Sequence, residues 1–177
     1  MYKKVLTVII TSSLIGNPLF ASNFFQKYLS LPLTQNANTV IQLKSNDKVN
    51  NFVDFSGTWV GSCTGNDELA MITIANSDTQ LLLNGKIFNI GSLETESTSN
   101  KDASYFFHIL LDWNADHSSL LFNDSYASHY HMQDLNEKRF GYEMGSISLK
   151  NEMLIYEVSS HNSDVGIETS VCTYRKQ

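Results

Sequence analysis

The sequence predicts an all-β fold, an antiparallel up-and-down β-barrel of eight or nine strands, with a β-sandwich as the alternative. From residue 55 onward, short runs of β-branched, aromatic and aliphatic residues alternate with segments rich in Asn, Asp, Gly and Ser. None of these runs has the period of an amphipathic helix. Asn84-Gly85 stands between two apolar runs, the pattern most typical of a two-residue hairpin turn. Regular short strands with turn signals favour a barrel or a sandwich.

The predicted strands follow one another at short intervals. Turn-forming residues such as Asn114, Asp116 and Asn151 separate them. The expected strand segments are residues 55–64, 68–76, the two arms of the hairpin within 80–90, 104–113, 118–132, 139–149, 152–159 and 166–175.

The N-terminus has the pattern of a secretory signal peptide. Lys3 and Lys4 precede a short apolar run that ends near Gly16, and Ala21 provides the small residue that cleavage needs. The alternative, a membrane anchor, would need roughly 20 apolar residues. We therefore expect residues 1–21 to be removed and the protein to be periplasmic or secreted. Residues 22–53 are expected to form a polar lead-in, and residues 54–177 the barrel domain.

The charge of the chain excludes some partners. The formal net charge is −6, and loss of Lys3 and Lys4 with the signal peptide would make it −8. An acidic chain without a basic run lacks the cations that neutralise phosphate groups. The sequence therefore predicts no nucleic-acid binding and no stable membrane insertion, and it indicates no particular protein partner.

The segment "DFSGTWVGSCTGN", residues 54–66, combines glycines with one tryptophan and one cysteine. In an extended strand Gly57, Trp59, Gly61 and Cys63 point to the same side. The glycines on either side of Trp59 leave space for its indole ring and for close approach of a neighbouring element. The cluster is therefore expected to serve the fold.

This segment resembles the first barrel strand of the calycin superfamily, the lipocalins and their relatives, which carries a Gly-x-Trp motif. The nitrobindin branch extends the motif with further glycines; Gly57, Trp59, Gly61 and Gly65 match it, and Cys63 replaces one glycine. That branch holds haem with a histidine near its C-terminus. This chain ends "SVCTYRKQ" without one, so no cofactor is expected. The resemblance implies an interior that holds a hydrophobic or amphipathic small molecule.

Two cysteines in an exported chain favour one disulfide, between Cys63 and Cys172. Closure of an up-and-down barrel makes its first and last strands neighbours. If the cysteines face each other across that antiparallel pair, Gly61 faces Tyr174 and Trp59 faces Lys176. Calycins commonly pack a basic residue of the last strand over this tryptophan, and the register selects Lys176 for that role.

Alternation along the later strands predicts a set of inward aromatic side chains. A buried tyrosine needs a partner for its hydroxyl group. The set therefore indicates either a well-bonded core or a cavity that holds water or an amphipathic ligand. The candidate ligand-binding residues are Tyr105, Phe107, Tyr126, Tyr130, Tyr142 and Tyr156.

His129 and His131 are the sharpest candidates for a metal site, because residues i and i+2 of a strand share a face. Asp134, together with His117 or His108, would complete such a site. The opposite face of this strand is the apolar one, so the alternative places both histidines on the outer, solvated face.

No catalytic residue set is recognisable, and an enzyme is not expected. The serines lack a Gly-x-Ser-x-Gly frame. Asp112, Asp116 and Asp124 are expected to flank turns, and Glu94 and Glu96 to lie in a polar loop. Two functions remain: an exported barrel that binds a small molecule, or an exported interaction or inhibitor protein with a filled barrel and no ligand.

Overall fold

The computed structural model describes residues 51–132, 135–162 and 166–177, and every regular element within them is a β-strand. The predicted signal peptide, its cleavage site and residues 22–50 of the predicted lead-in lie outside these residues. No helix with the length and apolar composition needed to cross a membrane occurs in the part of the chain that the structure describes.

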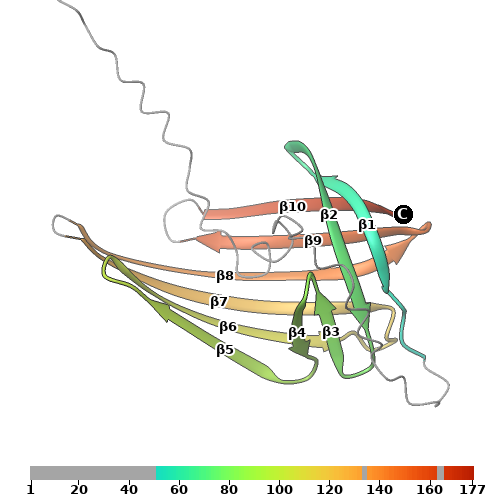
Figure 1. Ribbon diagram of the computed structural model, residues 1–177, viewed down its shortest axis with the longest axis horizontal. Helices are drawn as coiled ribbons and strands as arrows, with labels where there is room; N and C mark the ends of the chain where they lie inside the picture. Colours follow the sequence, from blue (N-terminus) through green and yellow to red (C-terminus); the bar gives the residue numbers. More distant parts are fainter. Residues whose placement is uncertain (1–50, 133–134, 163–165) are drawn as a thin grey trace, which may run out of the picture.

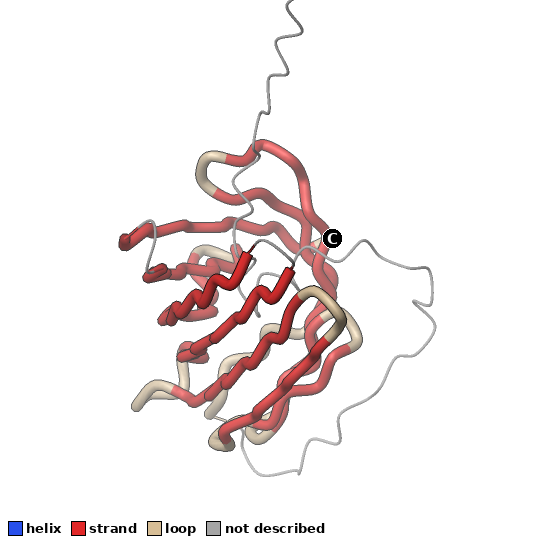
Figure 2. The backbone as a smooth tube through the Cα atoms, turned by 90° about the vertical axis from the view of Figure 1, so that its left-hand side faces the viewer, coloured by secondary structure: helices blue, strands red, loops and turns tan. Residues whose placement is uncertain are grey.

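Ten antiparallel strands form one strongly curved sheet, a nearly closed barrel (Figures 1 and 2). Their order across the sheet is β4-β3-β2-β1-β10-β9-β8-β7-β6-β5. A single sheet holds all the strands of the described residues, so the structure corresponds to the predicted barrel and not to a sandwich. The strands are β1 (Gly57–Cys63), β2 (Asn66–Asn76), β3 (Gln80–Leu83), β4 (Lys86–Asn89), β5 (Leu93–Ser99), β6 (Ala103–Trp113), β7 (Ser119–Met132), β8 (Leu135–Lys150), β9 (Met153–Asn162) and β10 (Gly166–Lys176).

The prediction of eight or nine strands is corrected to ten, because β5 was taken for a loop. The segment Leu93–Ser99 lacks apolar alternation, yet it pairs with β6 along its whole length. It is an edge strand, and charged residues such as Glu94 and Glu96 are common on edges because they discourage pairing with other chains. Backbone hydrogen bonds to β6, and not core packing, keep this strand in the sheet.

The predicted closure between the first and last strands is confirmed. Strand β1 pairs with β10, and the structure contains the Cys63–Cys172 disulfide. In the same register Gly61 faces Tyr174 and Trp59 faces Lys176. A Cβ atom at Gly61 would collide with the backbone of β10, so glycine is needed for this close approach.

The opposite seam, between β4 and β5, is joined mainly by side chains. Glu94 accepts hydrogen bonds from the backbone N–H of Asn89, at 2.6 Å, and from its side-chain amide, at 3.0 Å. Lys86 and Glu96 form an ion pair of 3.7 Å. Because no strand ladder crosses this seam, the barrel is nearly closed and not fully closed.

One end of the barrel encloses a dry core, and we call it the closed half. Trp59 is fully buried there, its indole N–H donates to the carbonyl of Phe55 at 2.9 Å, and the Lys176 ammonium lies 5.5 Å from its ring centroid. Phe55 is fully buried and stacks on Trp113. The other buried members include Ile72, Ile74, Leu81, Leu83, Phe88, Leu120, Ile147, Leu154 and Tyr174.

Two hairpin turns have the same backbone form. The predicted turn at Asn84-Gly85 is confirmed, with φ of 46° and 88° at its two central residues. Asn151 and Glu152 join β8 to β9 with φ of 53° and 63°. Thus a glutamate occupies the position that glycine holds in the first turn.

Candidate functional site

The inner face of the sheet changes character along strands β6, β7 and β8, which run beyond the short β3–β4 hairpin (Figure 1). Away from the closed half, most inward side chains are polar or aromatic and only partly buried, whereas the small residues Ala103 and Ser128 between them are buried. We call this region the open half. Its members from these strands are Tyr105, Phe107, Tyr126, Tyr130, Glu137 and Arg139.

Four of the six predicted ligand-binding residues meet in the open half. Phe107 and Tyr126 are direct partners across β6 and β7. Tyr105 contacts Tyr130 edge to face, with ring centroids 5.9 Å apart, and stacks along its own strand on Phe107 at 6.4 Å. Partial burial, together with the neighbouring Tyr130, raises the pKa of Tyr105. The hydroxyl group of Tyr105 therefore stays neutral and can donate or accept a hydrogen bond.

Arg139 brings a positive charge to the same surface. Its Nε donates to a carboxylate oxygen of Glu137 at 2.6 Å, and its guanidinium carbon lies 5.6 Å from the ring centroid of Tyr130. Both contacts hold the guanidinium against the inner face.

Asp124 and Glu143 form a buried carboxyl pair where the closed and open halves meet. They are direct partners across β7 and β8, with exposed fractions of 4% and 0%. Burial, reinforced by the charge of Asp124, raises the pKa of Glu143 to about 9. At neutral pH the pair therefore keeps a proton, because two adjacent buried carboxylates would repel each other.

Two glycines shape the surroundings of this pair. A Cβ atom at Gly141 would collide with the ring of Tyr126, and one at Gly145 with the ring of Phe122. The two rings therefore lie over the bare backbone of β8 on either side of Glu143. Such aromatic–glycine pairing covers a strand that has little side-chain volume of its own.

The prediction that Tyr142 faces inward is wrong. Tyr142 is 45% exposed and lies on the outer face with Phe140 and Met144. The inner positions of β8 are occupied by Gly141, Glu143 and Gly145, because the rings of β7 need the space.

The prediction that Asp124 flanks a turn is also wrong, since this residue lies within β7. A signal for its orientation was present in the sequence. Tyr126 and Tyr130 were predicted to face inward, and a period of two places Asp124 on the same face.

Tyr156 lies in the core and not in the open half. It is 1% exposed and stacks on Phe122 with ring centroids 5.3 Å apart. Burial, together with the carboxyl pair, raises its pKa well above the ordinary value. It therefore offers no accessible surface to a ligand.

The histidines of β7 share a face, as the sequence predicted. His129 and His131 have ring centroids 5.5 Å apart. Within the described residues, no group of three potential metal-ligating side chains gathers anywhere. His108 bonds to Thr95 and His117 stacks on Phe52, so neither completes a site with this pair. Asp134 lies outside the described residues.

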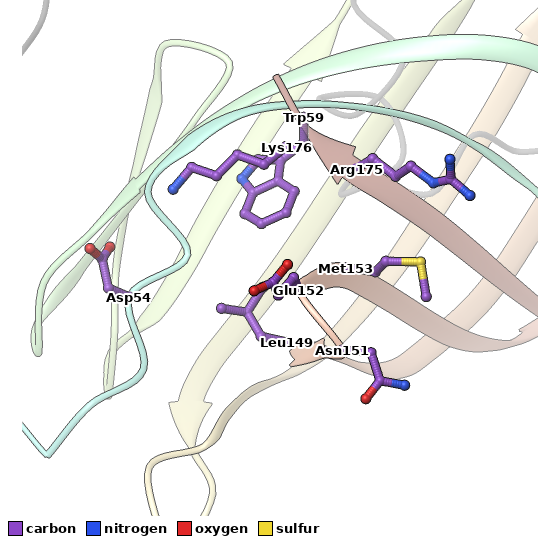
Figure 3. A pocket seen from close by; sticks show the side chains of 8 residues that line it. All are labelled: Asp54, Trp59, Leu149, Asn151, Glu152, Met153, Arg175 and Lys176. Carbon is purple, nitrogen blue, oxygen red and sulfur yellow. The ribbon is translucent and has the colours of Figure 1, made fainter.

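A cavity of about 610 Å³ opens beside Trp59 at the end of the closed half (Figure 3). Leu149, Met153 and Trp59 supply its apolar surface, and Asn151 lies at the β8–β9 turn. None of the predicted ligand-binding tyrosines lines it, whereas Trp59 and Lys176 do. The charged residues around the opening are Asp54, Glu152, Arg175 and Lys176.

No protein-family model, no curated protein and no solved structure matches this chain. The open half combines aromatic rings, phenolic hydroxyls and one guanidinium on a concave surface, which suits contact with an amphipathic molecule.

Proposed function

We propose that this protein is an exported, lipocalin-like barrel that binds a hydrophobic or amphipathic small molecule at its open half. The observation that carries the proposal is the gathering of four partly exposed aromatic side chains on the concave inner face of β6 and β7: Tyr105, Phe107, Tyr126 and Tyr130. Inward rings of a filled barrel would be buried like those around Trp59. The calycin resemblance of the first strand supports the same function.

The arrangement suggests how such a ligand binds. Its apolar part lies against Phe107 and Tyr126, and its polar group is held by the hydroxyls of Tyr105 and Tyr130 or by Arg139. The row of Asp124 and Glu143 limits how deep it reaches, because Phe122 and Tyr156 fill the space beyond. Binding would remove apolar surface from water and would be strengthened by about 25 cal/mol per Å² so buried.

Export is part of the proposal. The Cys63–Cys172 disulfide supports it, because disulfides persist mainly in oxidising compartments. Sequencing of the mature N-terminus tests it directly: the protein recovered from the periplasm or medium should begin at Ser22, whereas retention of residues 1–21 would contradict export with cleavage.

Titration with retinol, followed by its fluorescence, tests ligand binding, with fatty acids and haem as comparison ligands. Two tyrosines provide a matched pair of variants, because Tyr126 lies on the inner face and Tyr142 on the outer face of the neighbouring strand. Tyr126→Ser should weaken saturable binding at least about tenfold, a loss of about 1.4 kcal/mol. Tyr142→Ser should leave it unchanged. Equal effects of the two variants, or no saturable ligand, would contradict the proposal.

The alternative function, an exported interaction protein, is favoured by one observation on the outer face. Phe106 of β6 and Phe140 of β8 both pair with Ala127 of β7, and they are 50% and 59% exposed. Met144 and Tyr142 extend this apolar surface along β8. A partner or second copy bound there would be lost in Phe140→Ser, which sedimentation and pull-down experiments would detect.

A further inference from the structure

The cavity beside Trp59 has features of a second binding site, at the opposite end of the barrel from the open half. Its volume of about 610 Å³ lies within the range of small-molecule sites, about 300–1,000 Å³. Three separate segments build it: β1 with the stretch before it, the β8–β9 turn with the adjoining strand ends, and the end of β10. The disulfide and the β1–β10 ladder fix two of these segments relative to each other.

Charges of both signs surround this opening. Asp54 and Glu152 are acidic and Lys176 is basic, and in the described part of the chain none of the three forms an ion pair with another residue. Figure 3 shows the carboxylate of Glu152 below the indole of Trp59, while the ammonium of Lys176 is directed toward the side of Asp54. A positive and a negative group are thus both available at one opening with an apolar wall.

The backbone at Glu152 indicates that its side chain has a use. Glu152 has φ of 63°, a left-handed conformation that is unfavourable for a residue with a Cβ atom. The Asn84-Gly85 turn has the same form and carries glycine at the equivalent position. The β8–β9 turn therefore accepts strain that glycine would relieve, and strain of this kind is typical of functional positions.

From these observations we infer that the cavity binds a small zwitterion with an apolar side chain, such as an apolar amino acid or dipeptide. Glu152 and Asp54 receive the ammonium group of the ligand, and Lys176 donates to its carboxylate. Leu149, with the edge of Trp59, contacts its side chain. Lys176 keeps donors for this purpose while it lies over the indole, because its ammonium has three N–H groups.

Calorimetric titration with L-leucyl-L-leucine tests the inference, with the N-acetylated and the C-amidated dipeptide as charge controls. The zwitterion should bind with a Kd below about 10 mM, and each capped form should bind at least about tenfold more weakly. Amide chemical shifts should change around Glu152 and Lys176. No binding, equal binding of the capped forms, or shifts confined to the open half would overturn the inference.

Variants separate binding from folding. Glu152→Gln and Lys176→Gln should each weaken binding at least about tenfold, whereas Arg175→Gln should not. Arg175 is a matched control because its side chain points to the opposite side of the opening (Figure 3). Glu152→Gly should raise the melting temperature by about 2–8 °C through relief of strain and still weaken binding. A Glu152→Gly protein that is more stable and binds equally well would show that the carboxylate has no role.

Discussion

The two halves of the inner face are built from the same strands but differ in how deeply their side chains are buried. In the closed half, three residues that pair across β7, β8 and β9 are all buried: Leu120, Ile147 and Tyr156. In the open half, Phe107 of β6 pairs with Tyr126 of β7, and both side chains are partly exposed. The closed half supplies stability, and the open half keeps aromatic surface available.

The border between the halves is a row of mixed chemistry. Ile109, Asp124 and Glu143 follow one another across β6, β7 and β8. A buried carboxyl pair is costly, because burial penalises charge and each group disfavours ionisation of the other. Its position shows that the core of this barrel ends at these residues.

The largest expected effect is at Trp59. Trp59→Ala should lower the free energy of unfolding by about 3–5 kcal/mol, because it removes a fully buried ring and its hydrogen bond. Tyr105→Ala in the open half should lower the free energy of unfolding by only about 1 kcal/mol. Urea unfolding measures both, and similar losses would remove the distinction between the halves.

The disulfide should have the next largest effect. It joins cysteines separated by 109 positions in the sequence, and replacing both with alanine should lower stability by about 2–5 kcal/mol. Thiol titration of the denatured, unreduced protein checks the covalent bond. Two reactive thiols would contradict it.

The buried carboxyl pair of Asp124 and Glu143 should make the free energy of unfolding fall as the pH rises. The pKa of Glu143 is about 9 in the folded protein and near 4.5 when unperturbed, so the folded state binds more protons between these values. Its contribution to stability is therefore present below pH 4.5 and is lost as the pH rises to about 9.

Glu143→Gln should remove this pH dependence. At pH 8 we expect the variant to be more stable than the wild type by about 1–4 kcal/mol, with little difference at pH 4.5. Glu157→Gln, on the exposed side of β9, is the control and should leave the pH profile unchanged. A Glu143→Gln protein with the wild-type profile would show that the carboxyl pair does not mark the border.

The smallest expected change in stability is for a substitution on the outer face. Phe140→Ser should change the free energy of unfolding by no more than about 0.5 kcal/mol, because the ring is largely exposed. Thermal unfolding checks it. A loss of several kcal/mol would mean that Phe140 is covered in the native protein, which would favour the interaction function.

Much of the closed half could be predicted from sequence. Cys63, Cys172 and Trp59 set one register, and that register follows from closure of a barrel whose first and last strands are neighbours. Strand β5 could not be found by alternation, because Glu94 and Glu96 have no core to face. The orientation of β8 was reversed for a related reason: exposed Phe140 and Tyr142 look like core residues, whereas Gly141 and Glu143 do not.

The candidate site was therefore only partly predictable. Tyr105, Phe107, Tyr126 and Tyr130 were identified by alternation on strands whose inner face is aromatic. Glu143 was missed because its inward position depends on the rings of a neighbouring strand, and alternation within one strand contains no such information.

The open half is the proposed ligand-binding surface of this protein. Chemical-shift mapping of the isotopically labelled protein during a retinol titration tests this proposal most directly. We predict saturable shifts at the amides of Tyr105, Phe107, Tyr126 and Tyr130, with little change around Trp59 and on the outer face. Shifts confined to Phe106, Phe140 and Met144, or the absence of any saturable shift, would contradict the proposal.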